Sequence, residues 1–205
     1  MVAGLNAVKA QDPALGIHLH EVMKKQSFEY LKKTVLTEIG DKVDKALFID
    51  AGHIISSVFD KRGDKQTIFL FSENDIKAGP EFMKELPSEF YVEAVPGTSG
   101  VYITFKQMEE VYRRFPGAQE LASLITVEFR IREMQHLVSL HKKGIDRVDE
   151  FYLRFPHMLP AGHILTDAEV ATFLLLSDGA LRRLRRQLSN EERIVDPGKV
   201  KRKIK

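Results

Sequence analysis

Four arginines near the C-terminus have the spacing to bind a polyanion. Arg182, Arg183, Arg185 and Arg186 lie within about a turn and a half of a predicted helix. A helix that enters the major groove of DNA needs such side chains for phosphates and guanine edges. Ser177, just before this helix, can cap its first turn through its hydroxyl. The candidate DNA-binding residues are therefore Ser177, Ala180, Arg182, Arg183 and Arg186.

The element that would position these residues is a helix-turn-helix over 170–188. If the motif is numbered from Asp167, Ala171 takes the fifth position, where the helices come closest and only a small side chain fits. Apolar residues that would seal one helix onto the other are Val170, Leu174, Leu176, Leu181 and Leu184. Leu175 takes the turn position that usually carries Gly, and a bulky residue at positive φ costs on the order of 1–2 kcal/mol. The alternative is an ordinary buried helix pair with a solvated basic face.

The distribution of charge also favours a polyanionic partner. From Arg182 to Lys205 there are ten Lys or Arg and three acidic residues, a net charge of +7. Since the whole chain carries +2, the remainder carries −5. A basic end on an acidic body is typical of a module for nucleic acid. We expect the last segment, 199–205, to be disordered. Its basic side chains either contact phosphates or are simply solvated, and the sequence favours neither interpretation.

Upstream, short alternating apolar segments predict strands. We expect residues 1–31 to be helical and irregular, and 33–105 to form a sandwich or roll of short strands. The predicted strands are 34–39, 45–49, 53–59, 66–71, 91–95 and 101–105. Turn signals such as Gly40–Asp41 and Gly63–Asp64 separate them.

After residue 105 the apolar period changes to that of helices. We expect a short helix over 106–114, a long one over about 116–143, and another over 146–155. In the long helix, apolar residues recur every seven positions in two registers, an a/d seam of about three heptads. Its candidate dimer-seam residues are Leu124, Val127, Ile131, Met134 and Val138. The alternative is a helix packed only on its own domain, and both can hold on different faces.

This order of elements resembles the Crp/Fnr (catabolite-activator and fumarate-nitrate-regulator) superfamily of bacterial transcription factors. The segments KTVLTEIGDKVDKALFIDAGHI (33–54), DKRGDKQT (60–67) and FSENDI (71–76) resemble successive parts of that family's roll. The resemblance implies an α+β protein with an N-terminal cyclic-nucleotide-binding-like β-roll (jelly roll), a long dimerisation helix and a C-terminal helix-turn-helix domain. The corresponding expected domains are a sensory roll over 1–115, the helix over 116–143 and a DNA-binding domain over 144–205.

The resemblance also places a candidate effector pocket in the stretch 77–95. Its candidate residues are Gly79, Glu81, Ser88 and Glu89. In nucleotide-binding relatives an Arg pairs with the cyclic phosphate, but here that position falls at Ser88 or Glu89, and no Lys or Arg lies between Glu85 and Gly100. Because a bound phosphate needs a fixed cation or a set of backbone donors, we expect an effector that is not a cyclic nucleotide.

In the recognition helix, the family pattern has Glu followed four positions later by Arg. These positions fall at Gly179 and Arg183 here, so the Glu is lost and the Arg is retained. Arg183 is therefore the best candidate for base contact, with Arg182 and Arg186 contacting phosphate or groove. The partners implied are double-stranded DNA, a second copy of the chain as a homodimer, RNA polymerase and an unknown small-molecule effector. A regulatory or scaffold protein of the same fold that has lost sequence-specific DNA binding is the alternative.

Other functional classes find little support in the sequence. The chain has no cysteine, which excludes disulfides, thiolate metal sites and cysteine nucleophiles. Its histidines lack the spacing of metal ligands, and no arrangement typical of an enzyme stands out, including the convergent His and Glu ligands of a cupin-like enzyme. We expect no cofactor and no metal. Without a signal peptide or an apolar run of about 20 residues, we expect a cytoplasmic protein with no membrane contact.

Overall fold

The computed structural model describes residues 12–194, which form two compact units. The first unit extends to Ser57 and includes Leu70–Arg132, and the second combines Val58–Phe69 with the chain from Glu133 onward. The basic tail at 199–205, expected to be disordered, lies outside the described residues. Within 12–194, no helix is both long and apolar enough to span a membrane.

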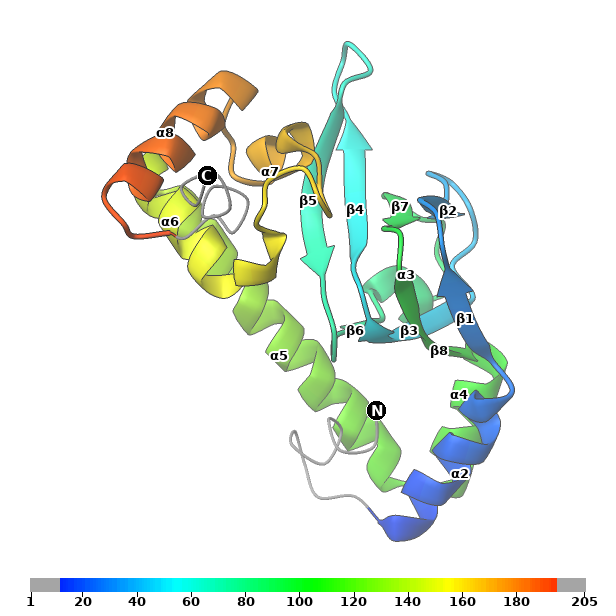
Figure 1. The fold of residues 1–205 in the computed structure, drawn as a ribbon. Helices are drawn as coiled ribbons and strands as arrows, with labels where there is room; N and C mark the ends of the chain where they lie inside the picture. The colour runs from blue at the N-terminus through cyan, green and yellow to red at the C-terminus, as the bar shows by residue number, and fades with distance from the viewer. Residues whose placement is uncertain (1–11, 195–205) are drawn as a thin grey trace. The chain divides into compact units, whose positions relative to one another are not determined.

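Eight strands form two four-stranded sheets (Figure 1), whose paired strands run antiparallel. One sheet has the order β1 (Ser27–Tyr30), β8 (Thr98–Thr104), β3 (Lys45–Ala51), β6 (Ile76–Lys77). The other has the order β2 (Thr34–Thr37), β7 (Tyr91–Ala94), β4 (Ile54–Phe59), β5 (Lys65–Phe71). The expectation of a roll is confirmed, and the six predicted strands correspond to all of these except β1 and β6.

The expectation of helical and irregular chain through residue 31 was wrong for β1. Four residues are too few to show a clear alternation, and β1 depends on its partner. It pairs with β8 from Ser27 opposite Val101 to Tyr30 opposite Thr98. Pairing with a distant strand supplies backbone hydrogen bonds that no local pattern records.

Helices cover one end of this roll. α2 (Pro13–Lys24) begins where the Asp12 carboxylate accepts a hydrogen bond from the Ala14 N–H at 2.9 Å. Its residues Leu15, Leu19 and Met23 are buried because they recur every four positions and so share one face. α4 (Phe105–Arg114) starts with a capping box of Thr104 and Gln107 and packs against α2 (Figure 1). A short helix, α3 (Pro80–Met83), follows β6.

The long helix α5 (Gly117–Leu140) has one apolar face in the core of the first unit. Ala118 and Leu121 are buried and Ile125 packs against the same core. Further along, the Phe129 ring stacks on Phe71, with 5.6 Å between the ring centroids. These positions recur every three or four residues, so a single stripe of the helix faces the roll.

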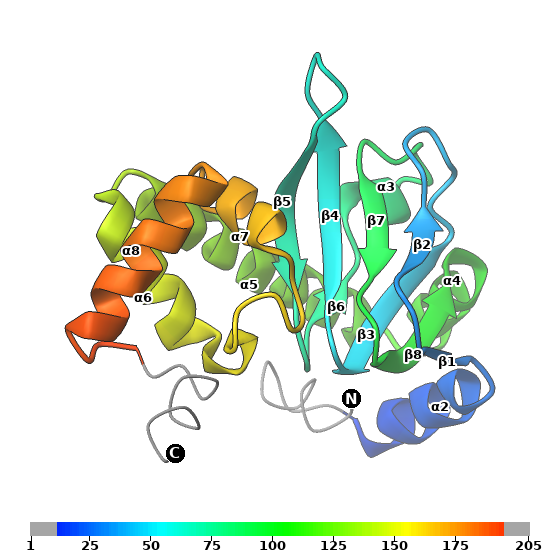
Figure 2. The ribbon, with the colours of Figure 1, turned by 45° about the horizontal axis from the view of Figure 1, so that its top comes forward.

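The second unit contains the predicted C-terminal helices. They are α6 (Gly144–Arg154), α7 (Asp167–Phe173) and α8 (Asp178–Asn190). A 3-10 turn (Pro156–Met158), which was not predicted, follows α6. α8 packs against both α6 and α7 (Figure 2) and buries Leu181 and Leu188 completely. Gly144, the first residue of α6, lies close to α8, where an added Cβ would be 3.2 Å from the Leu184 side chain.

Candidate functional site

The turn between α7 and α8 has the backbone of a helix-turn-helix. Leu175 lies at φ +51°, in the left-handed region, and its side chain is exposed. Two residues later, Ser177 caps α8, because its Oγ accepts a hydrogen bond from the Ala180 N–H at 3.3 Å. Ala171 has no exposed surface, as the close approach of the helices requires. The chain therefore adopts this turn with a leucine where glycine would be unstrained.

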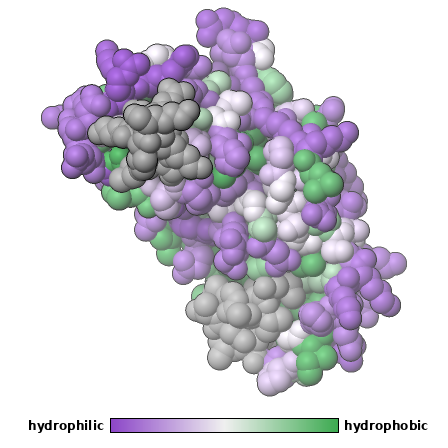
Figure 3. All heavy atoms as spheres, viewed as in Figure 1, coloured by the Kyte–Doolittle hydropathy of each residue, from purple (hydrophilic) through white to green (hydrophobic). Residues whose placement is uncertain are grey.

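Two arginines on α8 are available to a partner. Arg183 and Arg186 are exposed, and neither forms a hydrogen bond or ion pair with another residue of the described chain. Ala180 lies about one turn before Arg183 on the same helix and is partly exposed. The visible surface over α8 is mostly hydrophilic (upper left in Figure 3). Unpaired guanidinium groups on such a surface can contact phosphates and base edges without first breaking an internal contact.

The other two arginines contact the protein itself. Arg185 donates to both carboxylate oxygens of Asp167, at 2.7 and 3.0 Å, and to the Tyr152 hydroxyl at 3.1 Å. This contact holds the pKa of Asp167 below its usual value. Arg182 is exposed, but its Nε lies 3.7 Å from the Asp167 carboxylate. The four arginines thus have different roles although they are adjacent in sequence.

Contacts on both sides hold α7 in place. Glu169 is buried and closes a capping box with Thr166, whose N–H donates to the carboxylate at 2.9 Å. The same carboxylate accepts from the Lys65 ammonium at 3.3 Å. The backbone N–H of Thr67 donates to the Thr172 hydroxyl at 3.1 Å. The hairpin end of β5 and the first helix of the motif are therefore joined within the second unit.

Arg147, on α6, supplies a hydrogen bond to the C-terminal end of α7. Its Nη1 donates to the Leu174 carbonyl at 2.7 Å, which is one of the orphan carbonyls that every helix end leaves. Sequence reasoning missed Arg147 because nothing in the local pattern distinguishes it from a solvated charge.

Of the four candidate effector residues, Ser88 and Glu81 have polar partners within the chain itself. The Ser88 hydroxyl is buried and serves the backbone of Phe90, donating to its carbonyl at 2.7 Å and accepting from its N–H at 3.1 Å. Glu89 is exposed. Glu81 folds back over Gly79, so that a Cβ on that glycine would come within 2.3 Å of a Glu81 oxygen.

Sequence reasoning missed a cation at the start of this stretch, Lys77. Its side chain is 8% exposed and its Nζ lies 3.9 Å from a Glu81 oxygen. Burial lowers the pKa of Lys77, and Glu81 acts in the opposite direction. The sequence could not show that Lys77 is buried, because only the packing of β6 decides that this lysine points inward. A carboxylate of the chain itself thus faces this cation.

The candidate seam residues lie along a second face of α5. Leu124 is half-buried, whereas Val127, Ile131, Met134 and Val138 are each between 45% and 59% exposed. Steps of three and four residues connect them, so they form a continuous apolar stripe apart from the face that packs on the roll. Within residues 12–194, no group of three or more His, Cys, Asp or Glu could hold a metal ion.

No protein-family model matches the chain, and no curated protein sequence matches it either. Solved structures do match. FixK2 from Bradyrhizobium japonicum is 18% identical, with 81% of this chain and 85% of that one covered and a TM-score of 0.66. The c-di-GMP-responsive global regulator CLP of Xanthomonas campestris is 13% identical, with 88% and 93% covered and a TM-score of 0.64.

A third similar structure is the Thermus thermophilus catabolite activator protein. It is 16% identical, with 92% of this chain and 88% of that one covered and a TM-score of 0.54. Each of the three similarities covers at least 81% of this chain. The chain has the fold of Crp/Fnr regulators.

Proposed function

We propose that this chain is a dimeric, cytoplasmic, DNA-binding transcription regulator of the Crp/Fnr type. In this proposal residues 1–115 form the sensory domain, 116–143 the dimerisation helix and 144–205 the DNA-binding domain. The observation that carries it is the surface of α8, which begins at a capped residue. There Arg183 and Arg186 are exposed and make no hydrogen bond or ion pair within residues 12–194. A dimer would place two such helices on successive half-sites of a duplex.

The exposed stripe on α5 supports the dimer. A contiguous row of aliphatic side chains facing solvent is unfavourable in an isolated chain, and a second copy of the same helix covers such a row by knobs-into-holes packing. Because the stripe is separate from the face on the roll, pairing would require no rearrangement of the first unit.

We further propose that the effector is not a cyclic nucleotide. The stretch 77–95 offers Lys77 as its buried cation, and Glu81 already faces it. A cyclic phosphate would have to displace that carboxylate, which would lose the interaction already present. Calorimetric titration with cyclic AMP and cyclic GMP should show no saturable binding. A dissociation constant in the low micromolar range for either nucleotide would overturn this part of the proposal.

DNA binding can be tested with the full chain by fluorescence anisotropy. Selection from a random duplex pool would supply the preferred site. Arg183→Ala should weaken binding to that site by about 1–3 kcal/mol and relax its sequence preference. Arg186→Ala should weaken all duplexes alike and flatten the salt slope by about one unit. Arg113→Ala, which removes an exposed arginine on α4, is the control and should leave binding unchanged.

A protein of the same fold that acts through protein contacts is the second candidate function. It is favoured by Gly179, where the family pattern has Glu, and by the strained turn at Leu175. Failure of the wild-type chain to bind random duplex DNA at low salt, with no slope against salt concentration, would select this alternative.

A further inference from the structure

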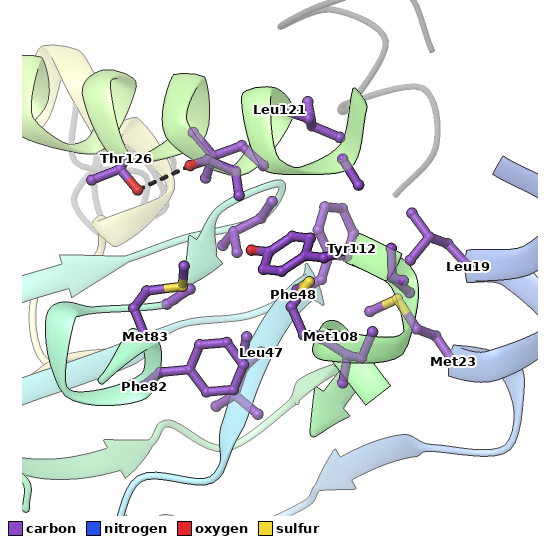
Figure 4. Close-up of a pocket in the computed structure, with 18 of the residues that line it drawn as sticks. Leu19, Met23, Leu47, Phe48, Phe82, Met83, Met108, Tyr112, Leu121 and Thr126 are labelled. Atoms are coloured by element: carbon purple, nitrogen blue, oxygen red, sulfur yellow. Dashed lines mark hydrogen bonds between the residues drawn. The ribbon is translucent and has the colours of Figure 1, made fainter. Parts of the chain in front are cut away.

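An apolar cavity in the first unit is not used by the proposed DNA contacts or by the candidate effector residues. It has a volume of about 90 Å³ and lies between the sheet that contains β3 and the helices α2, α4 and α5 (Figure 4). None of Gly79, Glu81, Ser88 and Glu89 lines it. Apart from Thr126, its walls are aliphatic, aromatic or thioether side chains, and no charged residue is among them.

A single unused polar group lies in this wall. The Tyr112 hydroxyl, on α4, is buried and has no hydrogen-bond partner among the described residues. Figure 4 shows the Tyr112 ring reaching into the lined space with its oxygen directed away from α4. The other hydroxyl of the wall, on Thr126, donates to the Ala122 carbonyl at 2.9 Å and so is satisfied. A buried hydroxyl without a partner is costly, and a bound group that accepts its hydrogen bond would remove that cost.

The methionines of the wall indicate how the cavity could adapt. Met23, Met83 and Met108 line it, and Met83 is partly exposed. Thioether side chains have several low-energy rotamers and can move to fit a ligand that is larger than the resting cavity. Engineered apolar cavities of about 150 Å³ take up benzene, so this cavity can accommodate a six-membered ring after a modest shift of its side chains.

We propose that this cavity binds a small, uncharged, mainly apolar molecule whose one polar atom accepts a hydrogen bond from Tyr112. A charged or phosphorylated ligand does not fit, because the wall has no cation to pair with it and burial of an unpaired charge is strongly unfavourable. As the identity of an effector, this inference rests on the proposed function. As a binding site, it concerns the first unit alone and needs no DNA.

The six methionines give an internal control for the test. In full-length protein with isotope-labelled methionine methyl groups, phenol and toluene serve as probes of equal size, with and without an acceptor oxygen. Both should shift the methyl resonances of Met23, Met83 and Met108 saturably. Met134 and Met158, which do not line the cavity, should stay in place. We expect dissociation constants at or below about 1 mM, which small apolar ligands commonly reach.

Two variants sharpen the test. Tyr112→Phe keeps the ring and should weaken phenol binding roughly three- to tenfold, the loss of one hydrogen bond, without weakening toluene binding. Ala122→Leu should fill the cavity and remove binding of both probes, with an unchanged urea-denaturation midpoint showing that the variant is folded.

Shifts that are linear and equal at all methionines would overturn the proposal, since the cavity would then be a packing void. Unchanged phenol affinity in Tyr112→Phe would overturn the ligand class. The methionine shifts and the phenol affinity are both measured without DNA. They would therefore test the cavity even if the chain did not bind DNA.

Discussion

Arg185 on α8 donates to both carboxylate oxygens of Asp167, the first residue of α7. The side chain of Arg185 is 15% exposed and that of Asp167 is 25% exposed, so water screens the pair only partly. The contact fixes the two helices of the motif against each other. One of four adjacent arginines is therefore part of the structure that presents the others.

This relationship predicts different effects for two neighbouring variants. Arg185→Ala should lower the free energy of unfolding by about 2 kcal/mol, because hydrogen bonds to charged partners contribute about 1.5–3 kcal/mol and Asp167 would be left partly buried. Arg186→Ala removes an exposed side chain that has no partner within residues 12–194, and it should change the free energy of unfolding by less than about 0.5 kcal/mol. Urea denaturation of both variants measures this, and equal effects would show that the Asp167 contact contributes nothing.

The turn at Leu175 predicts a stabilising substitution. Leu175→Gly should raise the free energy of unfolding by about 0.5–1 kcal/mol. Relief of left-handed strain, about 1–2 kcal/mol, exceeds the extra entropy that glycine loses on folding. Leu176→Gly, at the half-buried next position, is the control and should destabilise. Thermal denaturation compares the two. A loss of stability in both would mean that the exposed Leu175 side chain makes contacts that outweigh its backbone strain.

The exposed stripe of α5 predicts how the dimer can be broken. Changing Ile131 and Val138 together to Glu should convert a dimer into monomers, because each copy would bring unpaired charges into the seam. Gln135→Glu adds a charge at a flanking position, where such seams tolerate charged side chains, and should leave the dimer intact. Sedimentation velocity at micromolar concentration distinguishes the species. A wild-type monomer, or a dimer that survives both glutamates, would exclude this seam.

His136 predicts a dependence of stability on pH. Its ring stacks on Phe173 with 4.1 Å between centroids, and burial, followed by the nearby Arg154, lowers the pKa of His136 below 6.5. The unfolded chain therefore takes up a proton first as the pH falls. Stability should be lost as the pH drops from about 6.5 through the lower pKa of the folded state.

The matched variant for this prediction is His136→Phe, which keeps a stacked ring but cannot be protonated. Urea denaturation at pH 7.5 and 5.5 should show a larger loss of stability in the wild type than in the variant, since all other titrating groups are shared. Parallel losses in the two proteins would assign the pH dependence to those other groups.

The sequence by itself determined the order and type of the main elements. The alternation between 34 and 105 predicted six strands, and the spacing of small and apolar residues around Ala171 located the helix-turn-helix. The position of Leu175 in that motif predicted positive φ, which the structure has. These features depend on neighbours a few positions away, through the two-residue period of strands, the 3.6-residue period of helices and local turn geometry.

Only the tertiary structure decided which chemically equivalent side chains are engaged. Arg183 and Arg185 are alike in sequence, but Arg185 meets Tyr152 from a helix more than thirty positions earlier. Packing between distant segments likewise decides three other features. They are the inward position of Lys77, the strand β1 and the Tyr112 hydroxyl, which has no partner among residues 12–194. Local periodicity fixes the face on which a residue lies. Burial, pairing and cavities depend on what the rest of the chain places against that face, and this long-range packing leaves no short-range pattern in the sequence.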